Sequence, residues 1–299
     1  MTCVLGFNAI AFATEDAFIE GIYAFTVENL EATVVDVNIT EEEILVPKML
    51  GGFPVSNIGS GAFGGSETIK SVILPHGIKE LSPMSFAYSS GLKSVFLPET
   101  LNTIGDHAFY YCSNLNTITV PNSVKSIGNM AFGRCDGLLS ATIPSTVTTI
   151  EDDAFYSSPN VTVYGKSGSV AHNYAIANKL KFADLITVTL NDTPIFFDQP
   201  PIMDMVNYRT LVPMRAILEA LGATVSWDSS TMTSIATKDD ITLKIKNNSN
   251  TLYINDAPKT IDAVAQIVND RTLVPARAII EAFGFTVTWD EPNKVLSIN

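Results

Sequence analysis

Residues 94–116 read SVFLPETLNTIGDHAFYYCSNLN, and residues 117–139 follow the same plan as TITVPNSVKSIGNMAFGRCDGLL. Further copies start at Ser71 and Ser140, so four units open at intervals of 23 residues. A fixed period of about 20–29 residues is typical of a solenoid in which each repeat forms one coil. Because each coil contacts only its neighbours, such a stack offers an extended binding surface rather than a catalytic pocket.

Each unit begins with a short segment in which every second residue is apolar. This period of two predicts a β-strand with one buried face. The inward positions form ladders at the same spacing, the first being Val72, Val95, Ile118 and Ala141. A proline closes each segment, because proline cannot donate to a strand ladder. Aromatic residues recur further along, at Phe63, Phe86, Phe109, Phe132 and Phe155. We therefore expect these phenylalanines to share one interior row.

The segments that flank the repeats predict caps, which a stack needs because its end coils otherwise expose their core. Residues 23–37 read as two strands around a turn and predict an N-terminal cap hairpin. Residues 161–164 predict a last short strand. Residues 167–179 predict a capping helix with Ser167 or Ser169 as the N-cap.

The repeats resemble the BspA-like leucine-rich repeat of bacterial surface proteins over roughly residues 20–182. The residues that carry the resemblance in one coil are Leu97-Pro98, Ile104-Gly105, Ala108-Phe109 and Cys112. Members of that family are mostly secreted or surface-attached, and several are implicated in adhesion. The resemblance implies such a setting and brings no catalytic residues with it.

The second half of the chain is another duplication. Residues 208–228 read YRTLVPMRAILEALGATVSWD, and residues 270–290 read DRTLVPARAIIEAFGFTVTWD, at an offset of 62. Each copy predicts a strand, a helix that begins near a proline where proline is tolerated, and a second strand. Gly222 and Gly284 are placed to end the two helices.

This half resembles the copper amine oxidase N-terminal domain, also called a stalk domain, over roughly residues 185–299. The name does not imply an activity, because copper chemistry needs a cluster of soft nitrogen or sulfur ligands. This half contains no histidine and no cysteine, and the tyrosine motif that forms the oxidase cofactor is absent. We therefore expect no cofactor and no metal.

The predicted fold is a β-rich multidomain chain. A leucine-rich-repeat solenoid spans residues 14–183, and a small α+β domain with a duplicated strand-helix-strand motif spans residues 184–299. Residues 1–13 are interpreted as a signal peptide with a truncated start, because they are largely apolar and end in Ala-Phe-Ala. The alternative is a buried N-terminal strand or helix.

The composition of the chain argues against several classes of function. The net charge of −13 argues against nucleic-acid binding, because an acidic surface repels phosphate backbones. The sequence has no apolar run of about 18 residues, so no membrane span is expected. Charged residues make up 16% and hydrophobic residues 46% of the chain, which indicates a folded protein rather than a disordered one.

These observations predict a non-catalytic secreted or cell-surface protein, in a Gram-positive bacterium, that serves adhesion or ligand binding as a monomer. The solenoid is the recognition surface for a host or cell-wall protein or glycan, and the C-terminal domain is a spacer or wall-proximal element. Two alternatives stay open: a purely structural spacer of a larger surface system, and an accessory domain of a cell-wall hydrolase. A catalytic role for Asp106, His107 and Ser113 is disfavoured, because His107 lies at a variable loop position.

Two sets of outward residues are the candidate ligand contacts. The first set lies on the predicted strands and comprises Ile73, Phe96, Thr119 and Thr142. The second set lies in the loops and comprises Tyr88, Tyr110, Tyr111 and Tyr156. Exposed aromatic residues are favoured anchors in recognition. The alternative is that the tyrosines pack between coils.

Other residues have two interpretations each. Cys112 and Cys135 occupy one repeat position, which permits a disulfide between coils, but serines at the equivalent positions favour a small buried side chain. The duplicated arginines and acidic residues of the second half form either an anion or glycan site or ion pairs that fix helix to sheet, and we favour the ion pairs. Trp227 and Trp289 either stack on sugars or, as we favour, pack in the core.

Overall fold

The computed structural model describes residues 17–204 and 206–299, so the predicted signal peptide lies outside the described residues. The chain falls into two compact units. Within the described part, the first comprises residues 17–116, 120–138 and 144–160, and the second comprises 117–119, 139–143 and 161–299. The domain boundary at residues 183 and 184 stays a prediction.

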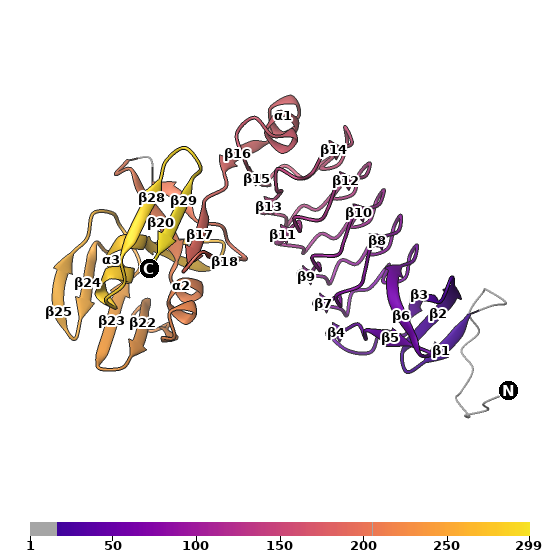
Figure 1. The fold of residues 1–299 in the computed structure, drawn as a ribbon, viewed down its shortest axis with the longest axis horizontal. Helices are drawn as coiled ribbons and strands as arrows, with labels where there is room; N and C mark the ends of the chain where they lie inside the picture. The colour runs from indigo at the N-terminus through magenta and orange to yellow at the C-terminus, as the bar shows by residue number, and fades with distance from the viewer. Residues whose placement is uncertain (1–16, 205) are drawn as a thin grey trace. The chain divides into compact units, whose positions relative to one another are not determined.

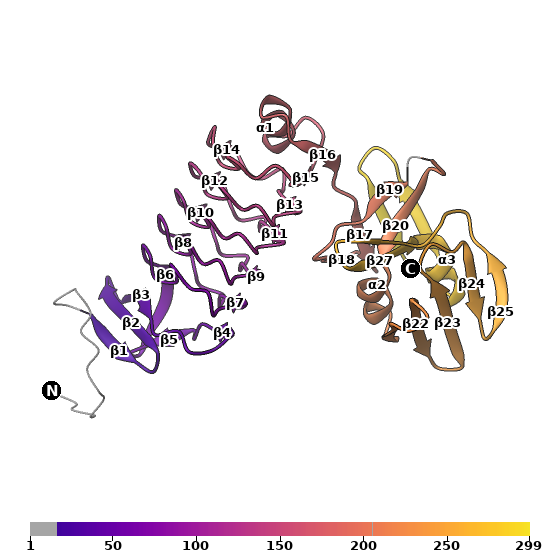
Figure 2. The ribbon, with the colours of Figure 1, turned by 180° about the vertical axis from the view of Figure 1, so that it is seen from behind.

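The repeats form a stack in which each coil contributes short parallel strands to two rows (Figures 1 and 2). One row consists of β6 (Phe53–Ile58), β8 (Glu80–Leu81), β10 (Thr103–Ile104), β12 (Ser126–Ile127) and β14 (Thr149–Ile150). The other row consists of two sheets. One contains β4 (Glu43–Leu45), β7 (Ser71–Ile73) and β9 (Ser94–Phe96), and the other contains β11 (Thr117–Thr119), β13 (Ser140–Thr142), β15 (Thr162–Gly165) and β16 (Lys181–Asp184). Paired residues of the central strands are 23 apart, as in Ile104 with Ile127, so each coil repeats the one before it.

The predicted interior row of phenylalanines is present and fully buried at its centre. Neighbouring rings stack nearly parallel, with centroids 4.8 Å apart for Phe63 and Phe86 and 5.4 Å apart for Phe109 and Phe132. These separations are close to the ~4.8 Å spacing of paired strands, so one aromatic ring fits each coil. Leu92, the last apolar residue of its coil, is also buried.

Both predicted caps form. At the N-terminal end, β2 (Tyr23–Glu28) and β3 (Glu31–Val37) make the hairpin, and β3 pairs with β6 in parallel. Two short strands join this end, β1 (Phe18–Glu20) against β2 and β5 (Met49–Leu50) against β6. At the other end, the helix α1 (Val170–Ala177) packs against β15 and β16. Its N-cap is Ser169, whose Oγ accepts a hydrogen bond from the backbone N–H of His172.

The described residues of the C-terminal half form two short helices, α2 (Met214–Ala220) and α3 (Ala276–Ala282), and three sheets. The first sheet consists of β18 (Thr193–Ile195), β17 (Thr187–Leu190), β29 (Val295–Ile298) and β28 (Val287–Asp290). The second consists of β19 (Ile202–Asp204), β20 (Arg209–Pro213), β27 (Arg271–Pro275) and β26 (Gln266–Val268). The third consists of β21 (Thr224–Asp228), β22 (Thr233–Lys238), β23 (Ile241–Lys246), β24 (Thr251–Ile254) and β25 (Ala257–Thr260).

The two copies are related through the antiparallel pair β20 and β27. Val212 pairs with Val274, and this offset of 62 is that of the sequence duplication. Pro213 and Pro275 precede the helices as N-caps, and Gly222 and Gly284 follow them with φ of 84°. The predicted strand-helix-strand motif is therefore confirmed in both copies, and the fold as a whole is the predicted solenoid followed by a small α+β domain.

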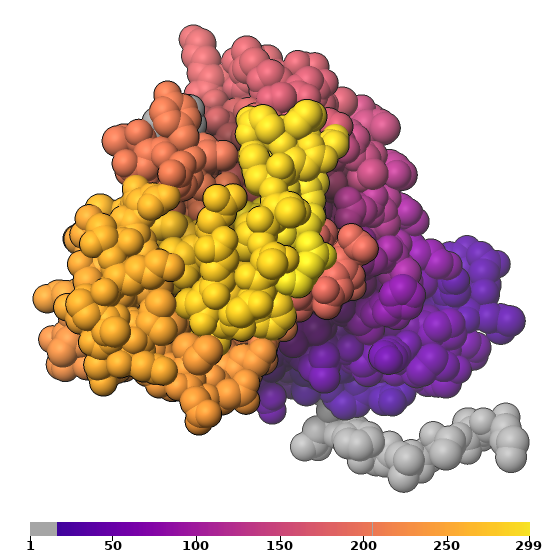
Figure 3. Space-filling view, turned by 60° about the vertical axis from the view of Figure 1, so that its left-hand side comes forward, coloured from indigo at the N-terminus to yellow at the C-terminus, as the bar shows by residue number. Residues whose placement is uncertain are grey.

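The copies differ in how their strands are closed. The last strand, β29, pairs in parallel with β17, the first strand of this half. In the third sheet, β24 and β25 form the hairpin that corresponds to β17 and β18 of the first sheet. Here the additional strand β23 lies between β24 and β22. Figure 3 shows the last residues, in yellow, at the surface beside earlier segments of the same half, in orange.

The two helices share one core. Four of their residues are fully buried in it: Ile217, Leu218, Ile279 and Ile280.

Candidate functional site

The predicted strand residues Ile73 and Phe96 lie in a row on the surface of the solenoid. Ile73 is paired with Phe96, and on its other side with Leu45, which the repeat period does not predict. The three side chains are 70% (Leu45), 49% (Ile73) and 62% (Phe96) exposed. We call these residues the apolar row. Thr119 and Thr142 are paired with each other on β11 and β13, and Thr119 is exposed whereas Thr142 is half-buried.

Leu45 was missed because β4 lies 28 residues before β7 rather than 23. A signal for it was available in the sequence. Residues 43–47 read EILVP, which matches the strand and closing proline of SVILP at residues 71–75. An insertion between these two segments breaks the period without changing the strand itself.

The predicted loop tyrosines Tyr88, Tyr110 and Tyr111 lie together, and we call them the tyrosine cluster. The ring of Tyr88 is 5.5 Å from that of Tyr110 in an edge-on arrangement and 5.8 Å from that of Tyr111. Tyr88 is 50% and Tyr111 43% exposed, whereas Tyr110 is half-buried and also contacts the ring of His107 at 5.4 Å. Tyr110 packs against its neighbours, as the alternative expects, whereas Tyr88 and Tyr111 face solvent, and their role as ligand contacts stays a prediction.

Tyr156 lies further along the stack and is exposed. Its backbone carbonyl accepts a hydrogen bond of 2.7 Å from the N–H of Arg134. Arg134 occupies the repeat position of Tyr88 and Tyr111 one coil after Tyr111. An exposed arginine thus separates Tyr156 from the tyrosine cluster along this edge of the coils.

The backbone of the tyrosine cluster adopts the left-handed region, which side chains other than glycine rarely occupy. Tyr88 and Tyr111 both have φ of 63°. In the first coil the equivalent position is Gly65, with φ of 72°. Each non-glycine residue in this conformation costs about 1–2 kcal/mol. Arg134 and Ser157 follow at the same repeat position in the next two coils, both with φ of 54°, so the repeat imposes this conformation on whichever residue stands there.

A row of buried serine and cysteine side chains supports the loops from inside. Ser89 Oγ donates to the carbonyl of Phe63, and Ser158 Oγ donates to that of Phe132 at 2.7 Å. Cys112 Sγ and Cys135 Sγ make the same bond one and two coils after Ser89, each at 3.1 Å. Both thiols are free, so the disulfide alternative is wrong and the small buried side chain is confirmed.

Burial controls the chemistry of these thiols. Desolvation raises the pKa of Cys135 to about 12 and the pKa of Cys112 well above its ordinary value of 9.0. A thiol must ionise to act as a nucleophile or a metal ligand. Among residues 17–204 and 206–299, no three His, Cys, Asp or Glu side chains gather so that they could hold a metal ion.

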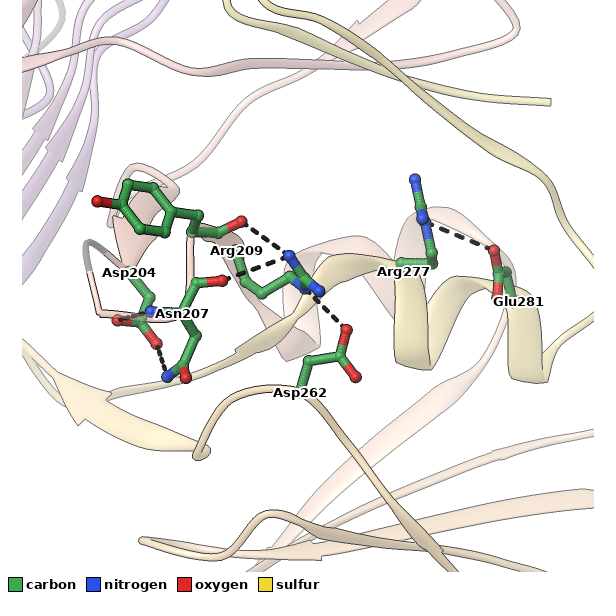
Figure 4. Close-up of polar contacts among 7 residues, drawn as sticks. Asp204, Asn207, Arg209, Asp262, Arg277 and Glu281 are labelled. Atoms are coloured by element: carbon green, nitrogen blue, oxygen red, sulfur yellow. Dashed lines mark hydrogen bonds and ion pairs between the residues drawn. The ribbon is translucent and has the colours of Figure 1, made fainter.

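The C-terminal half carries the second candidate site, which Figure 4 shows in close-up. Arg209 at the start of β20 donates from Nε to Asp262 at 2.8 Å and from Nη1 to the carbonyls of Asn207 and Tyr208 at 3.3 and 3.2 Å. On α3, Arg277 Nε lies 3.7 Å from Glu281 Oε1. A hydrogen bond of 2.8 Å from the Asn207 side chain lowers the pKa of Asp204 at the end of β19.

The expected ion pairs differ in part from the observed ones. Arg215 with Glu219 and Arg277 with Glu281 do pair along each helix, but all four side chains are largely exposed, so they do not fix helix to sheet. The strand arginines pair with residues outside the duplicated motif. Arg209 pairs with Asp262, and Arg271 pairs with Asp198 at 2.8 Å from Nε. Each of these pairs links a strand to a distant segment of the chain.

The two tryptophans also differ from each other. Trp289 is half-buried and packs against the core of this half, as the sequence favours. Its Nε1 donates to Glu291, and Lys294 Nζ lies 6.0 Å from its ring centroid. Trp227 is 37% exposed, so it is less buried than the predicted core packing requires. In the part of the chain that the structure describes, no helix is both long and apolar enough to cross a membrane.

Comparisons with solved structures find bacterial repeat proteins. The chain is 24% identical to the leucine rich repeat protein of T. pallidum, over 48% of this chain and 68% of that one, with a TM-score of 0.47. It is 27% identical to a leucine-rich repeat protein from Bacteroides ovatus, over 51% and 40%, with a TM-score of 0.44. It is 20% identical to a leucine rich cell surface protein from Faecalibacterium prausnitzii, over 66% and 61%, with a TM-score of 0.37.

A search of curated proteins gives no match. Family comparisons match both halves of the chain. Residues 52–162 match the BspA type leucine rich repeat region, in six copies. Residues 189–298 match the copper amine oxidase N-terminal domain. The chain therefore consists of a BspA-type leucine-rich repeat region followed by a copper amine oxidase N-terminal domain.

Proposed function

We propose that this protein is a secreted or cell-surface binding protein without catalytic activity, and that the tyrosine cluster is the centre of its recognition surface. The observation that carries the proposal is the position of Tyr88 and Tyr111. Both rings are exposed, and their centroids lie 5.8 Å apart. Two exposed aromatic rings in contact with each other support a role in binding, because exposed aromatic residues are favoured anchors in recognition.

The chemistry of the cluster suits recognition of a host or cell-wall protein or glycan. Tyrosine presents a large apolar ring together with a hydroxyl, and it loses little conformational entropy when it binds. The rings of Tyr88, Tyr110 and Tyr111 hold one another in place, so part of this entropy is lost before any partner arrives. The apolar row and the two paired threonines provide a second surface on the strands.

The experiment uses the full chain with substitutions that the repeat itself supplies. Tyr88→Gly and Tyr111→Gly introduce the residue of the first coil, Gly65, which adopts the same backbone conformation. Phe96→Thr introduces the residue that Thr119 provides in the next coil. Each variant is applied to an array of glycans and extracellular-matrix glycoproteins, with circular dichroism as a control for folding.

We expect the double tyrosine variant to bind its array partner at least about tenfold more weakly, which corresponds to about 1.4 kcal/mol. Phe96→Thr should have the smaller effect if the tyrosine cluster is the centre. Unchanged binding in both variants would show that neither surface is the recognition surface.

The proposed setting is outside the cell, and it rests on the matched repeat region. Fractionation of a producing Gram-positive bacterium into medium, wall and cytoplasm, followed by immunoblotting, tests this setting. Most of the protein should be in the medium or the wall. Recovery from the cytoplasm alone would contradict it.

A further inference from the structure

A groove of roughly 870 Å³ is lined by residues of the C-terminal half together with Phe182, Ala183 and Asp184 of β16. Its volume lies within the range of about 300–1,000 Å³ that is typical of small-molecule sites. Its lining includes Tyr208 from the turn before β20, Arg209 at the start of β20, Asp262 after β25, and Arg277 and Glu281 from α3. We propose that this groove binds a neutral saccharide. The proposal is independent of the one for the solenoid and assigns a ligand to a different part of the chain.

The polar groups of the groove match sugar hydroxyls, which donate and accept hydrogen bonds at the same time. Arg209 and Arg277 supply donors, and Asp262 and Glu281 supply acceptors directly beside them, at 2.8 and 3.7 Å (Figure 4). Because each guanidinium already has a carboxylate partner, an anionic ligand gains less from the arginines and is repelled by the carboxylates. A neutral polyol avoids that repulsion and uses both kinds of group.

The bonds of Arg209 fix its orientation without covering it. Its Nε and Nη1 are engaged by Asp262 and by two backbone carbonyls, yet the side chain stays 47% exposed. A guanidinium held in this way loses little further entropy when it binds a ligand. Arg277 is exposed on the neighbouring helix.

Tyr208 supplies an aromatic surface beside these polar groups. It is 73% exposed and has φ of 53°, in the left-handed region. In the second copy the equivalent residue is Asp270, with φ of 60°. Aspartate is among the residues that enter this region most readily, whereas tyrosine is not. The turn therefore favours aspartate, and the tyrosine at this position needs another reason, which stacking against the apolar face of a sugar provides.

The duplication also supplies a matched control. Arg271 pairs with Asp198 as Arg209 pairs with Asp262, and the two arginines are 46% and 47% exposed. Arg271 does not line the groove, and its neighbour is Asp270 rather than a tyrosine. An effect of Arg209→Ala that Arg271→Ala does not reproduce is therefore due to the groove rather than to the loss of an ion pair.

The test titrates the full chain with chitotetraose, with cellotetraose and with tetragalacturonate, by isothermal titration calorimetry and ligand-observed NMR. At least one of the two neutral tetrasaccharides should bind, and the anionic one should bind more weakly. Tyr208→Asp introduces the residue that the second copy carries in the same conformation, so the turn should fold. Tyr208→Asp and Arg209→Ala should each weaken binding at least about tenfold, whereas Arg271→Ala should leave it unchanged.

Three results would overturn the proposal. They are no binding of either neutral sugar, tighter binding of tetragalacturonate, and equal losses in Arg209→Ala and Arg271→Ala. The double variant Tyr88→Gly and Tyr111→Gly separates this proposal from the one for the solenoid. Neutral-sugar binding that this variant removes would place the sugar on the tyrosine cluster and would exclude the groove as its site.

Discussion

Both halves of this protein arose from duplicated segments, yet the duplications lead to different kinds of structure. In the repeat region the 23-residue units add one coil after another, and each unit pairs only with its neighbours. In the C-terminal half the 62-residue offset relates two copies that pair directly through β20 and β27 and share one core. Short units that cannot bury their own core give an open stack, whereas two larger units bury a common core and close on each other.

The comparison predicts that a core deletion has different consequences in the two halves. Phe109→Ala removes a ring stacked between Phe86 and Phe132 and should cost about 3–5 kcal/mol. Because support in a stack comes only from neighbouring coils, the loss should divide the solenoid into separately unfolding parts. Ile279→Ala in the shared core should cost about 2–5 kcal/mol and leave the C-terminal transition cooperative.

The chain offers separate probes for the two halves. Both tryptophans of the sequence, Trp227 and Trp289, lie in the C-terminal half, so their fluorescence in urea follows that half. Thiol labelling of Cys112 and Cys135 follows the solenoid. Phe109→Ala should shift the labelling transition and leave the fluorescence transition in place. An equal shift of both transitions would contradict independent unfolding.

Glycines in the two halves should respond differently to the same substitution. At Gly105 an added Cβ would lie 2.6 Å from the carbonyl oxygen of Leu81 in the preceding coil, so Gly105→Ala overpacks the stack and should cost about 1–3 kcal/mol. At Gly222 an added Cβ meets nothing within 4 Å, and only the φ of 84° opposes it, at about 1–2 kcal/mol.

Crystal structures and urea denaturation of the two glycine variants test this difference. Gly105→Ala should increase the spacing between its coil and the preceding one, while Gly222→Ala should leave the surrounding side chains in place. An unchanged coil spacing in Gly105→Ala, with no loss of stability, would show that the stack tolerates the methyl group.

The buried thiols predict a pH dependence that is confined to the solenoid. Their pKa values are raised in the folded state, to about 12 for Cys135 against an ordinary value of 9.0. The stability that this shift contributes is fully present below pH 9, and it is lost as the pH rises from 9 towards 12, because the unfolded chain releases these protons first. The C-terminal half contains no cysteine and should not show this component.

Urea denaturation of the solenoid across that pH range, followed by amide hydrogen exchange, measures the effect. The double variant Cys112→Ser and Cys135→Ser is the control, because lysines and tyrosines titrate over the same range in both proteins. The difference between parent and variant should grow above pH 9. A constant difference would show that the thiols do not titrate on unfolding.

The sequence predicts most of the fold because its requirements recur at fixed intervals. A buried ring in each coil, a proline after each strand and a glycine after each helix are local requirements. Each of them can be recognised from the residues nearby in the sequence. Leu45 is not found by the repeat period, because an insertion displaces its strand. The additional strand β23 has no counterpart in the other copy, so the duplication does not predict it.

Contacts between distant segments are the part that the sequence does not reveal. Asp198 and Asp262 end two similar segments, LNDTPIFFD at residues 190–198 and INDAPKTID at residues 254–262. The folded chain shows that Arg209 pairs with Asp262 and Arg271 with Asp198, so each arginine pairs with the aspartate that is more distant from it in sequence. The candidate loop residues behave similarly. Repeat spacing places Tyr88 and Tyr111 in neighbouring coils, but it does not reveal that their rings contact each other and that Tyr110 contacts both.

The smallest predicted effect concerns the row of hydrogen bonds beneath the loops. Cys112→Ser should change the free energy of unfolding by less than about 1 kcal/mol, because Ser89 and Ser158 already make the equivalent bond to a phenylalanine carbonyl. Cys112→Ala removes that bond and should cost more than the serine variant, by about 0.5–1.5 kcal/mol. Urea denaturation of both variants, followed by circular dichroism, ranks them. If alanine were tolerated better than serine, apolar packing of the thiol, rather than its hydrogen bond to Phe86, would be what this position requires.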